Sequence, residues 1–241
     1  MERKGSFIEK EIQSSYLNET KAVKIYLPES FSPLNKYNLC IMQDGNDYFQ
    51  MGRIATLSDR LHAEGEIENT VFAGIHYKNK ADRRKKYHLE GEEHEAYTNF
   101  IVREVIPMLD EIIPNLQMGR SRALIGDSLA GSFALSTAIR YPNTFGKVIM
   151  QSPYVDAALL QKVKNAANLD MLDIYHTIGT AEIEAALSDG KTEDLLTPNR
   201  ELNKLLQEKN SNYFYYELEN GDHTWKYWQR DMERVLITMF N

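Results

Sequence analysis

Ile125-Gly126-Asp127-Ser128-Leu129-Ala130-Gly131 is the stretch of sequence that decides the fold. The apolar residues 123–125 before it predict a short strand, and residues 132–139 after it predict a helix. A strand, a Gly-x-Ser-x-small turn and a helix together are typical of a nucleophile elbow, a tight turn that needs small residues beside the serine. Such a turn exposes the serine hydroxyl and directs the next backbone N–H toward a developing oxyanion. Because the short pattern also occurs in ordinary loops, its meaning depends on partners elsewhere in the chain.

The composition is that of a globular protein. The chain has 241 residues, of which 42% are hydrophobic and 26% charged, and it is long enough to bury a sizeable core. A net charge of −7 argues against nucleic-acid binding, which calls for a basic face. Cys40, the single cysteine, lies in an apolar run and is expected to be buried. We find neither a secretory signal nor an apolar run of the ~18 residues that span a membrane, so we expect a cytoplasmic protein without a membrane partner.

Short apolar runs alternate with helical patterns along the chain. We expect strands at residues 7–13, 22–27, 37–43, 70–76, 123–125, 148–152, 173–179 and 213–218, the first two antiparallel. We expect helices at residues 51–63, 95–113, 132–139, 156–167, 199–209 and 225–240. Strands separated by helices predict a mostly parallel sheet with helices on both faces. Since no repeat or linker interrupts the pattern, we expect residues 1–241 to form one α/β domain.

His223 is the candidate general base. It follows the last expected strand, in the polar loop 219–225. Functional residues of open parallel sheets gather beyond the carboxyl ends of the strands. A loop histidine on its own is often a solvated surface group, but the position ahead of the terminal helix favours the catalytic interpretation.

The other histidines are less well placed. His62 is expected on a helix surface and His176 inside the sheet, while His88 and His94 flank a charged loop. No cluster of His, Cys, Asp and Glu has the spacing of metal ligands, so we expect no metal and no other cofactor.

Glu182 is the candidate acid that would orient His223. It follows the strand expected at residues 173–179, so its carboxylate could accept a hydrogen bond from the histidine ring. The order Ser128, Glu182, His223 matches the nucleophile, acid, base order of α/β hydrolases. Glu184, Glu193 and Asp194 remain open as alternatives. Asp127 is a poor candidate because the tight turn holds it next to the serine.

Two backbone amides are candidates for the oxyanion hole. Leu129 directly follows the serine, and Asn46 follows the early strand that ends in Asp44-Gly45. The loss of one such donor costs roughly 3 kcal/mol of transition-state stabilisation. An ordinary Asp-Gly turn at residues 44–45 is the alternative interpretation.

With these residues in place, the chain resembles the esterase D-like branch of α/β hydrolases, which includes enterochelin, feruloyl and acetyl-xylan esterases and the mycolyltransferases. The resemblance runs from about Lys24 to the C-terminus. The matching stretches are Met42-Gln43-Asp44-Gly45, Arg83 with Tyr87, Glu104-Val105-Ile106-Pro107, the Ser128 turn, Tyr141-Pro142-Asn143-Thr144-Phe145-Gly146, Gln151-Ser152-Pro153, Gly179-Thr180-Ala181-Glu182, and Gly221-Asp222-His223-Thr224-Trp225 with Trp228.

The resemblance implies a nucleophile at Ser128, a base at His223, an acid at Glu182, and oxyanion amides from Leu129 and Asn46. The chain departs from the family at one position, because the family usually has glycine where Ala130 stands. The extra methyl group must then fit between the helix and the strand.

A basic segment, residues 78–86, stands out in this acidic chain. We expect a loop on the active-site side of the sheet, and a solvated charged run is the ordinary interpretation of such a segment. It could instead attract an anionic substrate, or Arg83 could hold a loop by pairing with a carboxylate. Arg83, Tyr87 and Trp225 are tentative substrate-binding residues, although Trp225 and Trp228 could simply pack the last helix onto the core.

Three hypotheses follow for the function. The first is a serine esterase that acts on a small-molecule ester through an acyl-enzyme on Ser128. The second narrows the substrate to a siderophore trilactone or another polyester. The third is a catalytically silent hydrolase fold that acts as a binding protein. The acyl group, the alcohol, the oligomeric state and a lid role for residues 190–198 stay open.

Overall fold

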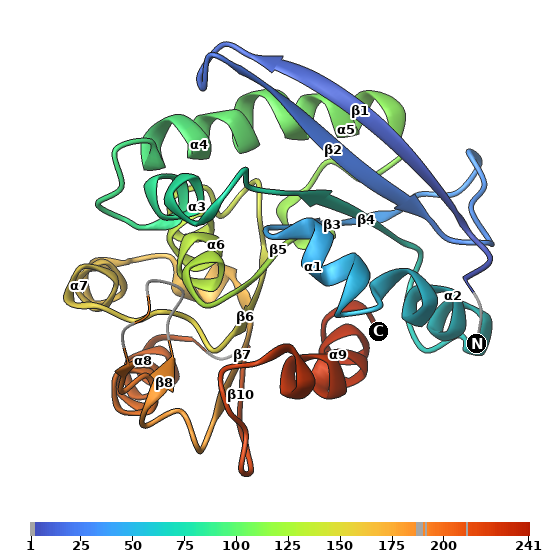
Figure 1. Cartoon of the computed structure of the whole chain (residues 1–241). Coiled ribbons are helices and arrows are strands. Elements are labelled where there is room, and N and C mark those ends of the chain that lie inside the picture. The colour runs from blue at the N-terminus through green and yellow to red at the C-terminus, as the bar shows by residue number, and fades with distance from the viewer. Residues whose placement is uncertain (1–2, 187–189, 191, 211) are drawn as a thin grey trace.

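The central sheet of the computed structural model crosses the whole molecule (Figure 1). The structure describes residues 3–186, 190, 192–210 and 212–241. Among these residues, eight strands form one sheet in the order β1-β2-β4-β3-β5-β6-β7-β10. The strands are β1 (Ser6–Ser14), β2 (Glu19–Leu27), β3 (Asn38–Met42), β4 (Thr70–Ile75), β5 (Arg122–Asp127), β6 (Lys147–Gln151), β7 (Asp173–Gly179) and β10 (Tyr213–Leu218). A small separate hairpin pairs β8 (Ala185–Ala186) with β9 (Thr192–Glu193).

The sheet is mostly parallel. The β1–β2 and β2–β4 pairs are antiparallel, and every other neighbouring pair from β4 to β10 is parallel. The parallel strands therefore end at one common edge, where their carboxyl ends meet. This architecture confirms the α/β fold class predicted from the sequence.

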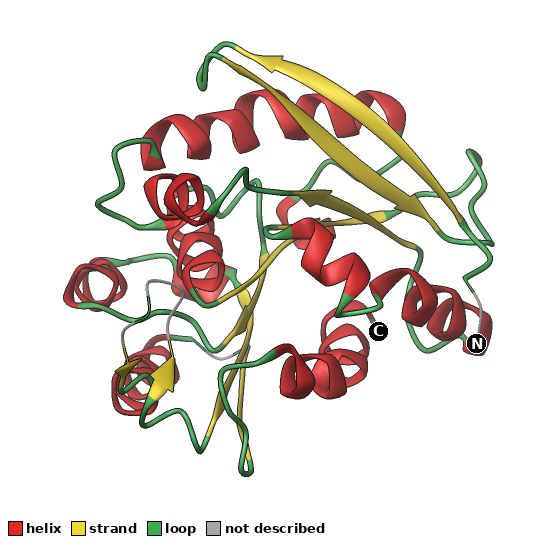
Figure 2. Ribbon diagram, viewed as in Figure 1, coloured by secondary structure: helices red, strands yellow, loops and turns green. Residues whose placement is uncertain are grey.

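Helices cover both faces of the sheet (Figure 2). On one face lie α3 (Lys80–Tyr87), α4 (His94–Phe100), α5 (Ile106–Ile112), α6 (Leu129–Arg140), α7 (Ala157–Asn165) and α8 (Leu196–Lys209). The other face carries α1 (Gly45–Gln50), α2 (Ile54–Glu64) and α9 (Trp225–Phe240). A π-helical turn (Ile101–Val105) joins α4 to α5, so the helix predicted at residues 95–113 is continuous. Two short 3-10 turns, Gly119–Ser121 and Leu169–Met171, precede β5 and β7.

Alternating side chains divide the core into two layers. In β3, Leu39 and Ile41 pack into the layer under α4–α8, whereas Cys40 and Met42 pack into the layer under α2 and α9. This period of two is what a strand buried on both faces requires. Cys40 is fully buried, as expected for a small apolar residue.

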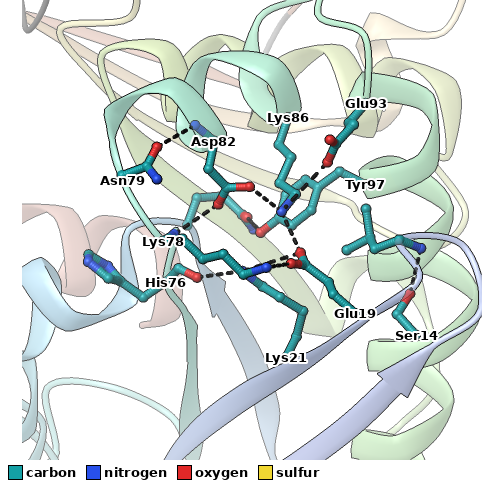
Figure 3. Close-up of polar contacts among 12 residues, drawn as sticks. Ser14, Glu19, Lys21, His76, Lys78, Asn79, Asp82, Lys86, Glu93 and Tyr97 are labelled. Carbon is teal, nitrogen blue, oxygen red and sulfur yellow. Dashed lines mark hydrogen bonds and ion pairs between the residues drawn. The ribbon is translucent and has the colours of Figure 1, made fainter.

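The prediction that residues 78–86 form a loop is wrong, because most of the segment belongs to helix α3. Six of its nine residues are exposed, as expected for a charged run, but Arg83 and Lys86 are buried, and Arg83 pairs with the Asp44 carboxylate as the alternative interpretation predicted. The Asn79 side chain caps the helix by accepting the Asp82 N–H at 2.9 Å. Lys86 is only 1% exposed, and its Nζ lies 2.5 Å from both Asp82 Oδ1 and Glu19 Oε1 (Figure 3). Its positive charge therefore ties α3 to the start of β2.

Two further local predictions need correction. The turn at residues 44–45 continues into helix α1, which a six-residue segment without apolar periodicity does not reveal. His62 is half-buried and not on a helix surface. Its Nδ1 lies 2.7 Å from the Ser58 carbonyl oxygen, and its Nε2 accepts the Thr70 N–H at 3.0 Å. Burial lowers the pKa of His62, while His176 is fully buried in β7 as predicted.

Candidate active site

Ser128 stands at the junction of β5 and α6 in a strained conformation. Its φ of 53° and ψ of −124° lie in a region that residues other than glycine rarely adopt. The Ser128 N–H donates to the Gln151 carbonyl at 3.0 Å, and the Ser128 carbonyl accepts the Tyr154 N–H at 3.0 Å. A Cβ at Gly126 would lie 2.3 Å from the backbone carbon of Ala130. The methyl group of Ala130 is therefore accommodated because residue 126 is glycine.

A cavity of about 280 Å³ lies beside Ser128 at the carboxyl ends of the strands. Aromatic and charged residues both contribute to its wall. Its lining comprises Ser128, Leu129, His223, Ala186, the aromatic residues Tyr77, Tyr154, Trp225 and Trp228, and the charged residues Asp44, Asp47, Lys80, Arg83, Arg84 and Asp127. The cavity thus collects residues from six segments of the chain, which lie at or after the ends of β3, β4, β5, β6, β7 and β10.

Glu182 holds the ring of His223. Its carboxylate is buried, with 1% exposure, and Oε2 lies 2.7 Å from His223 Nδ1. The other oxygen, Oε1, accepts the Ser152 hydroxyl at 2.6 Å and the Gly179 N–H at 2.8 Å. With Nδ1 bonded to the carboxylate, Nε2 is the ring nitrogen that can accept a proton.

Ser152 and Trp228 support this carboxylate, and sequence reasoning gave neither of them this role. The Trp228 indole N–H donates to Ser152 Oγ at 2.9 Å, and Ser152 in turn donates to Glu182. Ser152 has a φ of 46° and directly follows β6. Its place after a parallel strand is the signal that could have identified it.

The alternative acids are placed elsewhere. Glu184 is exposed, Glu193 lies in β9, and the Oδ1 of the exposed Asp194 accepts the Thr197 N–H at 3.0 Å. Within the described parts of the chain, Glu182 is the carboxylate that bonds to the His223 ring.

Ser128 and His223 line the same cavity without a direct bond in this structure. The hydrogen bonds of residues 3–186, 190, 192–210 and 212–241 include none between Ser128 Oγ and the His223 ring. Catalytic hydrogen bonds commonly tighten only when a substrate is bound. The shared cavity is therefore the relevant geometric observation.

The two candidate oxyanion amides lie at the starts of two helices. Leu129 is the first residue of α6 and lines the cavity; Asn46 is the second residue of α1. Backbone N–H groups in the first turn of a helix have no partner within the helix. Asn46 itself lines a neighbouring hollow, together with Lys21 and His76.

The three tentative substrate residues have different positions. Trp225 lines the cavity and packs edge-on against Tyr48, with ring centroids 4.8 Å apart. Arg83 also lines the cavity, but its Nε and Nη2 donate to Asp44 Oδ2 at 2.9 and 2.6 Å. Tyr87 is 1% exposed and lies behind the cavity wall, where its hydroxyl accepts the Asp44 N–H at 3.4 Å.

Burial shifts the pKa of two acidic residues of the wall upward. Burial and the nearby Asp44 carboxylate raise the pKa of Asp127, and Arg83 opposes that effect. Burial and Asp44 also raise the pKa of Asp47. In the described part of the chain, no three His, Cys, Asp or Glu residues are arranged to hold a metal ion, and no helix is long and apolar enough to cross a membrane.

Comparison with known proteins places the chain among esterases. The family model named Esterase, described as "Putative esterase", matches residues 14–239. An uncharacterized protein of Bacillus subtilis strain 168, YjcH, is 45% identical over 227 residues, which are 94% of each chain.

Solved structures with low sequence identity share the fold. A ferulic acid esterase has a TM-score of 0.79 at 18% identity and matches over 98% of both chains. The BES protein from Bacillus cereus has a TM-score of 0.78 at 19% identity, over 98% of this chain and 95% of that one. The enterobactin esterase FES from Shigella flexneri, solved with enterobactin, has a TM-score of 0.82 at 19% identity. This chain matches it over 97% of its own length but spans only 58% of that chain.

Proposed function

This chain belongs to the esterase family, and we propose that it hydrolyses a small-molecule carboxylic ester through an acyl-enzyme formed on Ser128. Ser128 is the nucleophile, His223 the general base and Glu182 the acid that orients it. The observation that carries the proposal is the 2.7 Å bond between His223 Nδ1 and the buried Glu182, in the cavity that also holds the strained Ser128. We also propose that residues 1–241 act as a single α/β-hydrolase domain.

In the first half of the reaction, Ser128 Oγ attacks the ester carbonyl carbon while its proton passes to His223 Nε2. The carbonyl oxygen becomes an oxyanion, and the amides of Leu129 and Asn46 donate hydrogen bonds to it. The intermediate collapses to an acyl-serine as the bond to the alcohol oxygen breaks. That oxygen leaves as an alcohol, carrying the proton from His223.

In the second half, water attacks the acyl-serine. His223 removes a proton from the water, and the same two amides bind the second oxyanion. Collapse of this intermediate releases the carboxylic acid and returns the proton to Ser128. Throughout both halves, Glu182 keeps Nδ1 protonated and stabilises the transient imidazolium.

The test compares Ser128→Ala with the unaltered protein on p-nitrophenyl acetate and with a fluorophosphonate probe. We expect the variant to lose turnover and labelling, while Ser136→Ala, two helical turns further along α6, where the hydroxyl accepts a hydrogen bond from Lys162, keeps both. If Ser128→Ala stays fully active, the proposed nucleophile is wrong. If the folded, unaltered protein neither turns over esters nor reacts with the probe, a binding protein with a silent hydrolase fold is favoured instead.

A second candidate function narrows the substrate to an anionic ester such as a siderophore trilactone. It is favoured by an exposed arginine in the cavity wall. Arg84 is exposed, lines the cavity and has no ion pair among the described residues, whereas Arg83 is already paired with Asp44. A catecholate trilactone bound to iron is anionic, so the exposed Arg84 guanidinium would attract it. The structural similarity to an enterobactin esterase is compatible with this candidate.

The substrate test measures kcat/KM for a trilactone and for short-chain neutral esters. For an anionic substrate, we expect Arg84→Gln to lower kcat/KM and to weaken its dependence on salt, while neutral esters are unaffected. Lys85→Gln is the matched control, because Lys85 pairs with Glu92 on the exposed side of α3. Hydrolysis of simple esters without hydrolysis of any trilactone would reject the siderophore assignment.

A further inference from the structure

We propose that Arg83 is a positioning residue that sets the distance between the two oxyanion amides, and that it is not a substrate ligand. This inference rests on the function proposed above. It concerns a guanidinium that joins two turns, one before each amide donor.

Arg83 bonds to both turns, each time at the residue two positions before a candidate amide donor. Its Nη2 donates to Asp44 Oδ2 at 2.6 Å and to the Asp127 carbonyl oxygen at 3.0 Å, and its Nε donates to Asp44 at 2.9 Å. Asp44 stands two residues before Asn46, and Asp127 stands two residues before Leu129. One planar group therefore fixes the segment that leads into each candidate donor.

The hydrogen bonds of Arg83 lie just beyond the last backbone bonds that join β3 to β5. The last β3–β5 pair is Met42 with Ile125, and one more backbone bond joins the Gln43 N–H to the Ile125 carbonyl at 3.0 Å. Beyond that point, Arg83 makes the next link between the two segments, through Asp44 and Asp127. The guanidinium thus continues the cross-link from the sheet into the turns.

Both turns contain a backbone conformation that needs support. Asp44 has a φ of 55° and Ser128 a φ of 53°, and such angles persist in residues other than glycine only when the surroundings enforce them. Arginine suits this task because its planar fork presents several donors in fixed directions. A lysine would offer one flexible point charge instead.

Arg83 is itself held in place. It is 8% exposed, and its guanidinium carbon lies 5.7 and 5.5 Å from the ring centroids of Tyr77 and Tyr87. Three residues further along α3, Lys86 anchors the helix to β2 through Glu19 (Figure 3). The Arg83 side chain therefore comes from a helix that is tied to the sheet, as a group that sets a distance must be.

The experiment measures kcat and KM on p-nitrophenyl acetate for Arg83→Met, Arg83→Lys, and Arg83→Met combined with Asp44→Asn. We expect Arg83→Met to lower kcat by about 10²–10³-fold, as for the loss of an oxyanion donor, with KM changed by no more than about threefold. Arg83→Lys should recover part of kcat, because one charge can hold one of the two turns. Lys85→Met, on the exposed side of the same helix, serves as the control.

The double variant separates positioning from mere stability. Arg83→Met leaves the Asp44 carboxylate buried without its partner, which is destabilising, and Asp44→Asn removes that charge. We expect the double variant to regain much of the thermal stability but not the lost kcat. Recovery of both together would overturn the inference in favour of a purely structural role. A loss confined to KM, or seen only with anionic esters, would overturn it in favour of substrate binding.

Failure of this inference is distinguishable from failure of the proposed function. If the unaltered protein is active and Arg83→Met stays within about threefold of its kcat, only the role of Arg83 is refuted. If Ser128→Ala is as active as the unaltered protein, the proposed function itself fails, and with it the basis for this inference.

Discussion

Replacing Glu182 with glutamine tests the orientation of the His223 ring more sharply than truncating the Glu182 side chain would. The carboxylate accepts hydrogen bonds from three donors: the Ser152 hydroxyl and the Gly179 N–H at Oε1, and the His223 ring at Oε2. Glutamine has one carbonyl oxygen and one NH2 group in place of the two oxygens. Because two donors already face Oε1, the carbonyl oxygen should take that position and the NH2 group should face His223.

An NH2 group facing His223 Nδ1 favours the wrong tautomer of the ring. Nδ1 must then accept a hydrogen bond, which moves the ring proton to Nε2, the nitrogen that would receive the Ser128 proton in the proposed mechanism. A carboxylate-to-amide change of this kind lowers kcat by about 10⁴-fold, or about 5.4 kcal/mol at about 1.36 kcal/mol per tenfold change. The Ser152 hydroxyl can rotate and accept a hydrogen bond instead, so that part of the His223 population would keep the correct tautomer. We therefore expect Glu182→Gln to lower kcat by about 10³–10⁴-fold.

The assay is the hydrolysis of p-nitrophenyl acetate at neutral pH, with circular dichroism to verify folding. Glu184→Gln is the matched control, because Glu184 is exposed two residues away and should keep full activity. Activity of Glu182→Gln within tenfold of the unaltered protein would refute this reasoning. A comparable loss in Glu184→Gln would show that the wrong acid was chosen.

Three further predictions concern stability. Gly126→Ala should cost about 1–3 kcal/mol through overpacking, because the new Cβ would lie 2.3 Å from the backbone carbon of Ala130; an unchanged Tm in thermal unfolding would contradict this. Lys86→Met should cost about 3 kcal/mol in urea unfolding, the lower end for breaking a buried ion pair, since Glu19 and Asp82 remain 14% and 13% exposed; a loss below about 1 kcal/mol would count against it. Burial lowers the pKa of His176 to about 4 from its usual 6.5. As pH falls from 6.5 toward 4, the unfolded chain gains a proton there that the folded chain does not, so stability falls by up to about 1.4 kcal/mol per pH unit. His176→Leu should remove this part of the slope, and equal slopes in urea titrations of both proteins would disprove the assignment.

The central strands were predictable because they are buried on both faces. Runs such as residues 37–43 and 148–152 are short, apolar and bounded by turn residues, which is what a central parallel strand requires. The serine turn was predictable for a related reason. A φ of 53° at Ser128 and the close approach of Gly126 to Ala130 demand small neighbours, and small neighbours can be read from the sequence.

The basic segment was harder to interpret because charge says nothing about burial. Residues 78–86 look solvated in the sequence, yet Lys86 is enclosed by carboxylates that come from β2 and from α3 itself. The Glu19 partner lies 67 positions away in the chain. Such a pairing depends on tertiary structure, and no local pattern encodes it.

The support of the carboxylate at Glu182 was hidden for the same reason. Glu182 could be proposed from its place after a strand, but Ser152 and Trp228 reach it from another strand end and from the last helix. Their contribution lies in the direction of two hydrogen bonds. The sequence shows which residues follow each predicted strand, but it does not show in which direction their side chains point.

The backbone of Glu182 has a consequence for how this enzyme family can diversify. The Glu182 carbonyl accepts the N–H groups of Leu195 and Leu196 at 2.9 and 3.1 Å, so the chain returns to its starting point after the excursion that carries β8 and β9. Ala186, within that excursion, lines the cavity. Insertions or deletions within the excursion can change which molecules fit in the cavity. The two hydrogen bonds to the Glu182 carbonyl would meanwhile keep Glu182 in place. In the proposed mechanism, sequence changes in this excursion would alter which substrates enter the cavity and leave the positions of Ser128, His223 and Glu182 unchanged.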